Sequence, residues 1–395
     1  MRVLLFTGKG GVGKTTTAAS TAALAAAQGR KTLVLSTDPA HSLADALGMH
    51  VGASPTEVDT GLAAMQVDPQ RAFERTWREV QRYLLAALQR AGVDALQAEE
   101  LTVLPGAEEV LALLAVRDQV ASGLWDLVVV DCAPTGETLR LLSLPAALRW
   151  YVDKVFPAQR RALRAVRPVL ARVGGPAVPA EEIFDAVERL HAELADVHAL
   201  LTAPSTSVRV VLTPEAVVVA ETRRTLTSLA LYGYRVDALV ANRVFPVGSP
   251  DAFVAGWSRA QQEQLASVRR DVAPLPVLLS PYLAHEPVGL AALTALGHEL
   301  YSGRAPADDL PQQAALVEVD RTAEGYVLSL ALPLAHLDEV DLARSGDELV
   351  VTVAGHRRLL ALPSALRRCV VVGASLAGGR LRVQFAPDPQ LWMAT

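Results

Sequence analysis

The sequence is poor in cysteine and in aromatic residues, and it contains no long hydrophobic run. Of its 395 residues only Cys132 and Cys369 are cysteines, which excludes a disulfide framework and a zinc site made of cysteines within one chain. No apolar stretch reaches the roughly 18 residues of a membrane-spanning helix, so we expect at most peripheral contact with a membrane. The first apolar segment soon meets a glycine-rich stretch, unlike a signal peptide, and a cytoplasmic location is predicted.

A strong net charge is also missing. The chain has 37 basic and 42 acidic residues and a formal net charge of −5, which disfavours a general nucleic-acid-binding protein with its basic surface. Hydrophobic residues make up 51% of the chain, enough to bury a sizeable core. The length suits two or three domains. These features indicate a globular protein whose partners are not nucleic acids.

A glycine-rich stretch near the N-terminus carries the strongest functional signal. It follows the apolar segment 3–7 and precedes an alanine-rich helical segment, residues 18–27. The pattern G-x-x-x-x-G-K-[ST] is typical of a loop whose backbone N–H groups cradle phosphates at a helix N-terminus. Lys14 is expected to reach the β- and γ-phosphates of a nucleoside triphosphate, and the Thr15 hydroxyl to ligate Mg²⁺. A glycine-rich turn without a ligand is the alternative. The pattern consists of Gly8, Gly13, Lys14 and Thr15.

Two aspartates follow predicted strands. Asp38 comes directly after segment 31–37, and Asp131 after segment 124–130, whose apolar character suits a strand covered on both faces. Ligands of open α/β sheets lie at the carboxyl ends of parallel strands, so Asp38 is expected to act in catalysis and Asp131 to hold the Mg²⁺ shell. A buried strand that ends in aspartate is common by itself, but the upstream glycine-rich loop favours the functional interpretation.

The order of the predicted elements indicates an α/β fold. Strands alternate with helical segments, which predicts the doubly wound, mostly parallel sheet of a P-loop NTPase over residues 1–302. Helices are expected at 70–100 and, as an insertion, at about 144–202. Within this insertion the amphipathic, strongly basic segment 144–173 either binds a client or an anionic surface, or packs as a helix pair with a solvated basic face. Further strands are predicted at 208–213, 237–241 and 275–279.

The C-terminal part has a different pattern. A polar linker, residues 303–313, is followed by short segments with turn signals, which predict a small all-β sandwich over residues 314–395. The clearest strand runs from Arg380 to Phe385, because apolar and polar residues alternate there. Few contacts are expected to cross so polar a linker. The other predicted strands are 325–332, 348–353, 357–362 and 369–372.

Three segments of the first domain form a recognisable set. They are Gly8-Lys9-Gly10-Gly11-Val12-Gly13-Lys14-Thr15-Thr16, Thr37-Asp38-Pro39-Ala40-His41-Ser42 and Asp131-Cys132-Ala133-Pro134-Thr135-Gly136. Together with Asn242 and the region around Pro281, this set resembles the ArsA-type ATPases. That family contains the arsenite-pump ATPase and the cytosolic ATPase that targets tail-anchored membrane proteins. The resemblance covers about residues 1–300 and implies hydrolysis of ATP with Mg²⁺. It also implies a homodimer, because the family pairs two nucleotide halves and this chain carries one.

The resemblance also implies a role for each matching residue. Lys9 resembles a signature lysine that reaches the phosphates of a second subunit, and Asp38 resembles the residue that orients the attacking water. Asp131 opens the second switch, and Asn242 resembles the adenine reader. The implied catalytic residues are Lys9, Lys14, Asp38 and Asp131, and the implied metal ligands are Thr15, Asp38 and Asp131. Nucleotide binding is assigned to Gly8, Gly10, Gly11, Val12, Gly13, Lys14, Thr15, Thr16, Asn242, Pro281 and Tyr282.

The chain departs from this family in several respects. Glu137 stands where the family usually has a histidine, which leaves the signalling role of that histidine open. The arsenite-binding cysteines are missing, which disfavours a metalloid-efflux subunit, and so is the zinc-binding C-x-x-C of the eukaryotic targeting ATPase. A partitioning or septum-placing ATPase shares the Lys9-containing loop and is the alternative, although such proteins often have a terminal amphipathic helix or a basic face. A redox protein like the nitrogenase iron protein would need interface cysteines.

Segments of the C-terminal part resemble the α-crystallin-like domain of small heat-shock proteins, with an unrelated small β-sandwich as the alternative. The segments are 326–333, 347–355 and 379–383. We therefore predict an ATPase that cycles between open and closed dimers and captures or targets a hydrophobic or protein client. The C-terminal domain is expected to hold or shield that client.

Overall fold

The computed structural model describes residues 1–38, 42–67, 107–133, 192–193, 195–308 and 315–389. The chain divides into two compact units. The first joins Met1–Gln66, Trp125–Leu139 and Thr202–Thr395, and the second joins Val67–Leu124 and Arg140–Leu201. The second unit contains helix α5 (Ala107–Ala121). The predicted helical segment 70–100, Glu137 and most of the predicted helical insertion at about 144–202 lie outside the described residues, whereas residues 195–202 are helical.

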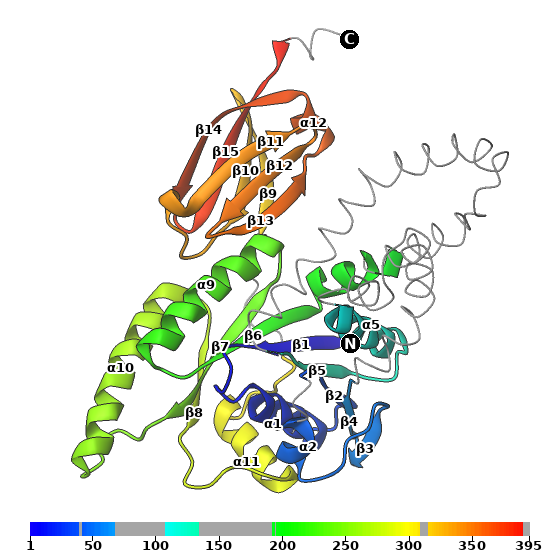
Figure 1. Cartoon of the computed structure of the whole chain (residues 1–395), viewed down its shortest axis with the longest axis vertical. Helices are drawn as coiled ribbons and strands as arrows, with labels where there is room; N and C mark the ends of the chain where they lie inside the picture. The colour runs from blue at the N-terminus through cyan, green and yellow to red at the C-terminus, as the bar shows by residue number, and fades with distance from the viewer. Residues whose placement is uncertain (39–41, 68–106, 134–191, 194, 309–314, 390–395) are drawn as a thin grey trace, which may run out of the picture. The chain divides into compact units, whose positions relative to one another are not determined.

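An eight-stranded sheet forms the centre of the first unit (Figure 1). Its strands are β1 (Arg2–Thr7), β2 (Thr32–Ser36), β3 (Thr56–Asp59), β4 (Leu62–Gln66), β5 (Leu127–Asp131), β6 (Thr206–Leu212), β7 (Val236–Val244) and β8 (Val277–Pro281). They are arranged in the order β3-β4-β2-β5-β1-β6-β7-β8, and only the β3–β4 pair is antiparallel. The predicted doubly wound, mostly parallel α/β sheet is confirmed.

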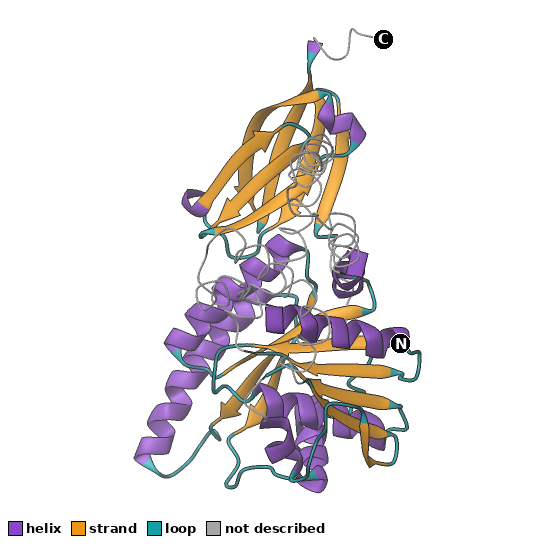
Figure 2. Ribbon diagram, turned by 45° about the vertical axis from the view of Figure 1, so that its right-hand side comes forward, coloured by secondary structure: helices purple, strands orange, loops and turns teal. Residues whose placement is uncertain are grey.

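Helices cover both faces of this sheet (Figure 2). They are α1 (Lys14–Ala27), α2 (Ser42–Leu47), α9 (Ala216–Tyr232), α10 (Ala252–Val272) and α11 (Leu290–Tyr301). The connections β1-α1-β2 and β6-α9-β7 cross the sheet in opposite directions, so right-handed crossovers place α1 and α9 on opposite faces (Figure 1). Covered on both faces, strands β2, β5 and β6 are buried along their whole length. No helix among the described residues combines the length and the apolar character needed to cross a bilayer.

The strand order reverses at β1: the strands that follow it in sequence are added first on one side of β1 and then, from β6, on the other. This strand lies between β5 and β6, and its register pairs Phe6 with Asp131, which in turn is paired with Ser36 of β2. The carboxyl ends of β1, β5 and β2 therefore lie side by side. Ligands of open α/β sheets bind outside the carboxyl ends of strands at such a reversal. The fold thus places the segments after these three strands at the expected binding position.

A charged network is buried within the same unit. Arg209 of β6 is 1% exposed, and its guanidinium donates to Asp237 at 3.0 Å, to the Tyr301 hydroxyl at 2.6 Å and to the Pro306 carbonyl at 2.9 Å. Asp237 also accepts a hydrogen bond from Arg2 at 3.2 Å. A buried cation is tolerated when hydrogen bonds of this kind replace its hydration. The network ties β6 and β7 to the end of α11.

The C-terminal part is a β-sandwich of two antiparallel sheets, as predicted. Its elements are β9 (Val317–Thr322), β10 (Gly325–Ala331), η1 (Leu337–Glu339), β11 (Val340–Ser345), β12 (Glu348–Val353), β13 (His356–Ala361), α12 (Ser364–Arg367), β14 (Cys369–Ala377) and β15 (Arg380–Pro387). One sheet has the order β14-β15-β10-β9 and the other β11-β12-β13. In β15 the side chains of Leu381, Val383 and Phe385 are buried between the sheets, which matches the alternation in the sequence.

Helix α9 packs against this sandwich. Leu231 is fully buried in the same apolar cluster as the sandwich core. The Thr227 hydroxyl donates to the carbonyl oxygen of Pro333 at 2.6 Å, and the Arg358 guanidinium donates to that of Leu231. The rings of Tyr232 and His356 meet edge to face, 6.3 Å apart. The expectation that few contacts would join the two domains is therefore wrong. The contacts come from α9 and not from the linker.

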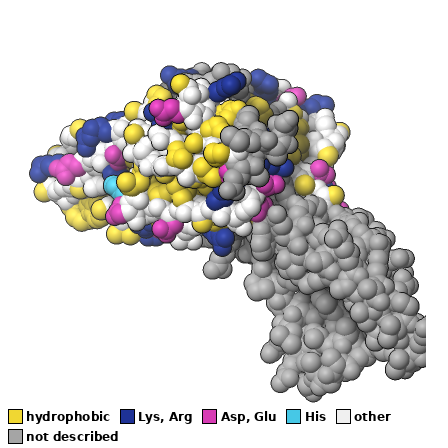
Figure 3. All heavy atoms as spheres, turned by 90° about the horizontal axis from the view of Figure 1, so that it is seen from above, with side chains coloured by type: hydrophobic (Ala, Val, Ile, Leu, Met, Phe, Trp, Pro, Cys, Tyr) yellow, Lys and Arg dark blue, Asp and Glu magenta, His cyan; other side chains and the backbone are white. Residues whose placement is uncertain are grey.

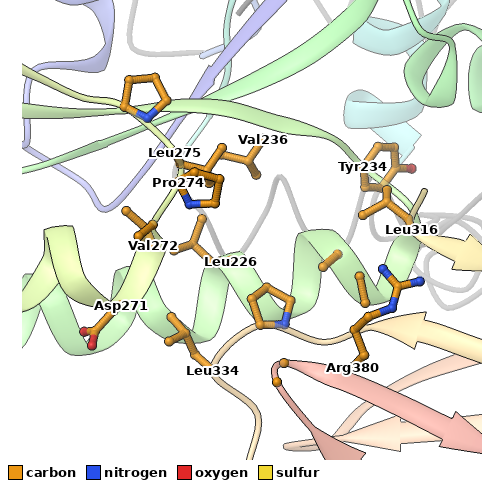
Figure 4. A pocket seen from close by; sticks show the side chains of 17 residues that line it. Leu226, Tyr234, Val236, Asp271, Val272, Pro274, Leu275, Leu316, Leu334 and Arg380 are labelled. Carbon is orange, nitrogen blue, oxygen red and sulfur yellow. The ribbon is translucent and has the colours of Figure 1, made fainter. Parts of the chain in front are cut away.

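An apolar cavity of about 500 Å³ lies beside this contact (Figure 4). Leu226 of α9, Leu275 before β8 and Leu334 after β10 are among its lining residues. Its charged lining residues, Asp271 and Arg380, each have an ion-pair partner. The cavity therefore presents apolar side chains from the sheet domain and from the sandwich.

Candidate active site

Two glycines of the loop between β1 and α1 are required by its geometry. Gly8 has a φ of 152°, and a β-carbon there would lie 2.1 Å from the carbonyl oxygen of Val211. Gly13, the N-cap of α1, has a φ of 92°, and a β-carbon there would lie 2.2 Å from Nδ2 of Asn242. No residue with a side chain fits either position without displacing its neighbours. The loop therefore ends at the N-terminus of α1 in a conformation that suits anion binding.

The two lysines of this loop lie in different environments. Lys14 is the first residue of α1 and is 6% exposed, and its Nζ donates to the carbonyl oxygen of Lys9 at 3.3 Å. The Lys9 side chain is 39% exposed, and its Nζ lies 3.7 Å from Oε2 of Glu221 on α9. Lys14 is therefore held within the loop, whereas the Lys9 ammonium is paired outside it.

Asp131 lies at the end of β5 and is fully buried. Its Oδ2 accepts hydrogen bonds from the hydroxyls of Thr15 at 2.8 Å and of Ser36 at 3.2 Å. Burial raises the pKa of the Asp131 carboxyl to about 6, while the Thr15 hydrogen bond and the charge of Lys14 act in the opposite direction. The Thr15 hydroxyl is also 3.0 Å from that of Ser42. Asp131 thus joins the loop to the ends of β5 and β2.

The oxygen atoms around Asp131 fit a hard divalent cation. Oδ1 of Asp131 is buried and has no hydrogen-bond partner among the residues that the structure describes. Leaving such an oxygen unpaired is costly, and Mg²⁺ with its water shell supplies the charge and the donors that are missing. The described parts of the chain contain no cluster of three or more His, Cys, Asp or Glu residues suited to a metal. Thr15 and Asp131, with Asp38 near them, are the residues that could hold Mg²⁺.

Asp38 follows β2 and lies within electrostatic reach of Asp131, since its negative charge contributes to the raised pKa of that carboxyl. Its backbone is fixed on both sides. The Asp38 N–H donates to the Ser36 hydroxyl at 3.2 Å, and its carbonyl oxygen accepts from Nε2 of Gln66 at 2.7 Å. Asp38 itself is half-buried. These hydrogen bonds hold the second aspartate beside the first.

A cavity of about 370 Å³ adjoins the loop. Its volume lies within the usual range for small-molecule sites. Tyr282 is 53% exposed and stacks on the ring of Phe245, with centroids 4.8 Å apart and planes inclined by 6°. An exposed aromatic ring of this kind can stack on a planar base. The predicted nucleotide-binding residues that line the cavity are Gly13, Thr16, Asn242, Pro281 and Tyr282.

Asn242 connects this cavity to the loop. Its Nδ2 donates to the carbonyl oxygen of Val12 at 2.8 Å, and its Oδ1 accepts from the N–H of Arg243 at 3.0 Å. Arg243 has a φ of 58°, which is uncommon for a residue other than glycine, and its carbonyl oxygen accepts from the buried Gln261 at 3.0 Å. The residue predicted to read adenine therefore also fixes the loop.

The structure brings the predicted residues into two adjoining groups, one around Asp131 and one around the cavity. The Lys9 ammonium pairs with Glu221 of α9, and Gly10 and Gly11 are exposed on the loop. Sequence reasoning missed several polar residues that position these groups. Two of them end strands, a signal that could have found them, whereas the two inside helices carry no such signal. The missed residues are Ser36, Gln66, Glu221 and Gln261, and Ser42 of the predicted segment had been given no role.

Two family profiles match this chain. The sequence profile of the anion-transporting ATPases, the ArsA family, matches residues 1–302. The chain belongs to the ArsA family. A second profile, an HSP20-like domain found in ArsA, matches residues 323–385. The predicted ArsA-type ATPase with an α-crystallin-like C-terminal domain is thereby confirmed.

Several relatives of this ArsA-family chain cover most of its length. An uncharacterised protein of Streptomyces coelicolor is 41% identical over 395 residues, 99% of each chain. A protein of Prosthecochloris vibrioformis, whose name assigns it provisionally as an arsenical pump-driving ATPase, is 36% identical over 370 residues, 93% of this chain and 91% of that protein. ATPase get3 of Aspergillus niger is 30% identical over 293 residues, 71% of this chain and 85% of that protein.

Proposed function

We propose that this ArsA-family ATPase hydrolyses ATP with Mg²⁺ and works as a homodimeric switch that captures or targets a hydrophobic or protein client. The observation that carries the proposal is the 2.8 Å hydrogen bond from Thr15 to Asp131, because it joins the glycine-rich loop to the end of β5. Asp38 lies beside this pair. A phosphate loop, a buried carboxylate and a second carboxylate able to orient water suit hydrolysis of a phosphoanhydride.

Each of these residues has a distinct task in the proposal. Bound Mg²⁺, held by Thr15 and Asp131 with Asp38 beside it, would neutralise charge on the phosphates. Lys14 stabilises the negative charge that develops on the phosphate oxygens as the bond to the leaving group breaks. Asp38 orients the water whose oxygen attacks the γ-phosphorus. Asn242 and Tyr282 hold the base in the adjoining cavity.

Lys9 is the reason for proposing a homodimer. Its ammonium is not needed among the loop's own phosphate contacts, where Lys14 already lies, and its side chain is 39% exposed. An exposed cation on a phosphate loop can reach the nucleotide of a facing subunit. Lys9→Ala is therefore expected to lower both ATP-dependent dimerisation, measured by light scattering, and hydrolysis. Full activity in this variant, or in a strictly monomeric preparation, would contradict the proposal.

A hydrophobic client requires exposed apolar surface. Strand β14 lies at the edge of its sheet and exposes Val370, Val371 and Val372 by 41%, 38% and 60%. Figure 3 shows hydrophobic side chains gathered beside charged ones on the face that it views. Exposed apolar surface of this kind is typical of a site that binds another apolar chain. We assign client holding to this domain. The basic segment 144–173 stays a second candidate, outside the described residues.

A metalloid is a less suitable substrate. Both cysteines of the chain, Cys132 and Cys369, are buried. Burial, together with the charge of the neighbouring Asp131, raises the pKa of the Cys132 thiol to about 12, so this group stays protonated at neutral pH. Soft ions bind the thiolate form. The observations on the described residues therefore favour a client over a metalloid.

Two substitutions test the assignment of the aspartate and the lysine. Asp38→Asn is expected to bind ATP with nearly unchanged affinity and to hydrolyse it about 100-fold or more slowly, because only the orientation of water is lost. Lys14→Ala is expected to lose both hydrolysis and affinity, because its charge contacts the phosphates. Affinity is measured with a fluorescent ATP analogue and hydrolysis by phosphate release. Asp45→Asn, an exposed carboxylate on α2, is the matched control.

The same two variants show whether Asp38 orients water or binds phosphate. An equal loss of ATP affinity in Asp38→Asn and Lys14→Ala would show that Asp38 binds phosphate and does not orient water. If the proposal holds, Asp38→Asn stays closed on ATP and retains its client. Pull-down with this variant in ATP, compared with ADP, is then expected to enrich the client.

A further inference from the structure

The ion pair between Lys9 and Glu221 has no task in the function proposed above. Nζ of Lys9 lies 3.7 Å from Oε2 of Glu221, and the two side chains are 39% and 30% exposed. Lys9 belongs to a loop, whereas Glu221 belongs to α9, a helix of 17 residues. The next residue on α9, Thr222, is buried and bonded to the Val218 carbonyl oxygen at 2.9 Å. The position of Glu221 is therefore set by a packed helix.

The strength of this pair suits a reversible contact. Partly exposed ion pairs change an equilibrium constant by up to about fivefold, and salt weakens them further. Nucleotide phosphates carry more negative charge than one carboxylate, so phosphates that come within reach compete successfully for the Lys9 ammonium. A buried or bidentate pair would not be exchanged so readily.

We propose that Glu221 is a positioning residue for Lys9. It holds the ammonium against α9 while no facing nucleotide is present, and it gives the ammonium up when a second subunit brings its phosphates into reach. The expected effect on dimerisation rests on the proposed homodimer. The contact between Lys9 and Glu221 lies within one chain and does not depend on it. The two can therefore be tested separately.

The holding contact is tested by the rate at which Lys9 is acylated. The nucleotide-free full chain is treated with the N-hydroxysuccinimide ester of acetic acid, and modification is quantified by peptide mass spectrometry, with the exposed Lys31 as internal reference. Glu221→Gln is expected to raise the relative rate at Lys9 by about two- to fivefold at low salt and to abolish its salt dependence. Glu215→Gln, an exposed glutamate at the N-cap of the same helix, is expected to leave it unchanged. Equal rates in the two variants would overturn the proposal.

The consequence is tested by ATP-dependent dimerisation. Glu221→Gln is expected to lower the protein concentration at half-dimerisation by up to about fivefold, and to have no effect in a Lys9→Gln background. An unchanged midpoint, or the same shift without Lys9, would overturn the role of Glu221. Absence of an ATP-dependent dimer in every variant would instead contradict the proposed function, with the acylation rates still deciding whether Glu221 holds Lys9. The thermal midpoint of Glu221→Gln serves to exclude a change in folding.

Discussion

A β-carbon on Gly13 would lie 2.2 Å from Nδ2 of Asn242, and the same nitrogen donates a hydrogen bond to the carbonyl oxygen of Val12. The end of β7 thus approaches the glycine-rich loop so closely that this loop and the adjoining cavity form one surface. A change on either side is therefore expected to alter nucleotide binding as a whole.

Gly13→Ala is expected to weaken ATP binding at least about tenfold while the secondary structure, measured by circular dichroism, is retained. The residue has a φ of 92°, and strain of this kind costs about 1–3 kcal/mol before the contact with Asn242 is counted. Gly256→Ala is the control, because this glycine lies inside α10 with nothing near its β-carbon. There, alanine is expected to stabilise the helix by about 1 kcal/mol. Normal ATP affinity in Gly13→Ala would show that the loop can move away.

The nucleotide-free protein is expected to lose stability as the pH rises from about 4 to about 7, to the extent that Asp131 contributes. Its pKa is raised from 3.8 to about 6 by burial, so the ionised form is disfavoured in the folded state. The contribution of Asp131 to the free energy of unfolding is fully present below its pKa in the unfolded chain. It is lost as the pH rises through its pKa in the folded protein. The difference amounts to at most about 3 kcal/mol.

The comparison of wild type with Asp131→Asn isolates this contribution. Denaturant unfolding at several pH values should show the difference in stability between the two proteins changing over this pH range. Mg²⁺ with ATP is expected to bind the ionised carboxylate and so to bind more tightly as the pH rises through 6. A pH-independent difference between wild type and Asp131→Asn would contradict the raised pKa.

Tyr301→Phe is expected to destabilise the protein by about 1–3 kcal/mol. The hydroxyl of Tyr301 accepts a hydrogen bond from Arg209 at 2.6 Å and lies 2.7 Å from the Thr21 hydroxyl, so its removal leaves a buried cation with one partner fewer. Tyr326→Phe, at a partly buried tyrosine of the sandwich, is the control. Equal effects of the two substitutions in urea unfolding would show that the buried network contributes little.

A chain that ends at Asp308 is expected to bind and hydrolyse ATP, because no residue of the candidate site lies beyond residue 302. It is also expected to be less stable and less soluble, since the cut exposes Leu231, which is buried in the sandwich core. Leu231→Ala should cost the full chain about 2–5 kcal/mol and the shortened chain much less. Thermal melts of the four proteins check this. Equal costs in both lengths would contradict the contact.

The sequence was sufficient for the features that depend on local pattern. The loop between β1 and α1 was predicted because its pattern fixes the spacing of glycines and a lysine, and strand β5 was predicted because it is continuously apolar up to Asp131. Strands β3 and β4 were not predicted, because their sequences favour a strand only when they pair within the sheet. β4 is Leu62-Ala63-Ala64-Met65-Gln66, whose alanines have little preference for a strand until β2 pairs with them. Strand β9 was missed because, as an edge strand, it is largely polar and exposed.

The contacts that were not predicted join residues far apart in the sequence. Arg358 donates to Leu231 across 127 residues of sequence, and no periodicity or spacing in either segment indicates that they meet. The same holds for Glu221 and Lys9, which share an ion pair although one lies in a helix and the other in the glycine-rich loop. Positions of this kind depend on how the finished sheet arranges its helices.

Helix α9 has a practical consequence for any exchange of domains within this family. The compositional boundary of the C-terminal domain lies at the polar linker, yet the last turns of α9 supply Thr227 and Leu231 to the interior surface of that domain. The boundary between the two domains therefore lies along α9, a helix that covers the parallel sheet. A chimaera that takes its sandwich from a relative should also take residues 227 and 231 from that relative, so that the two packed surfaces remain complementary.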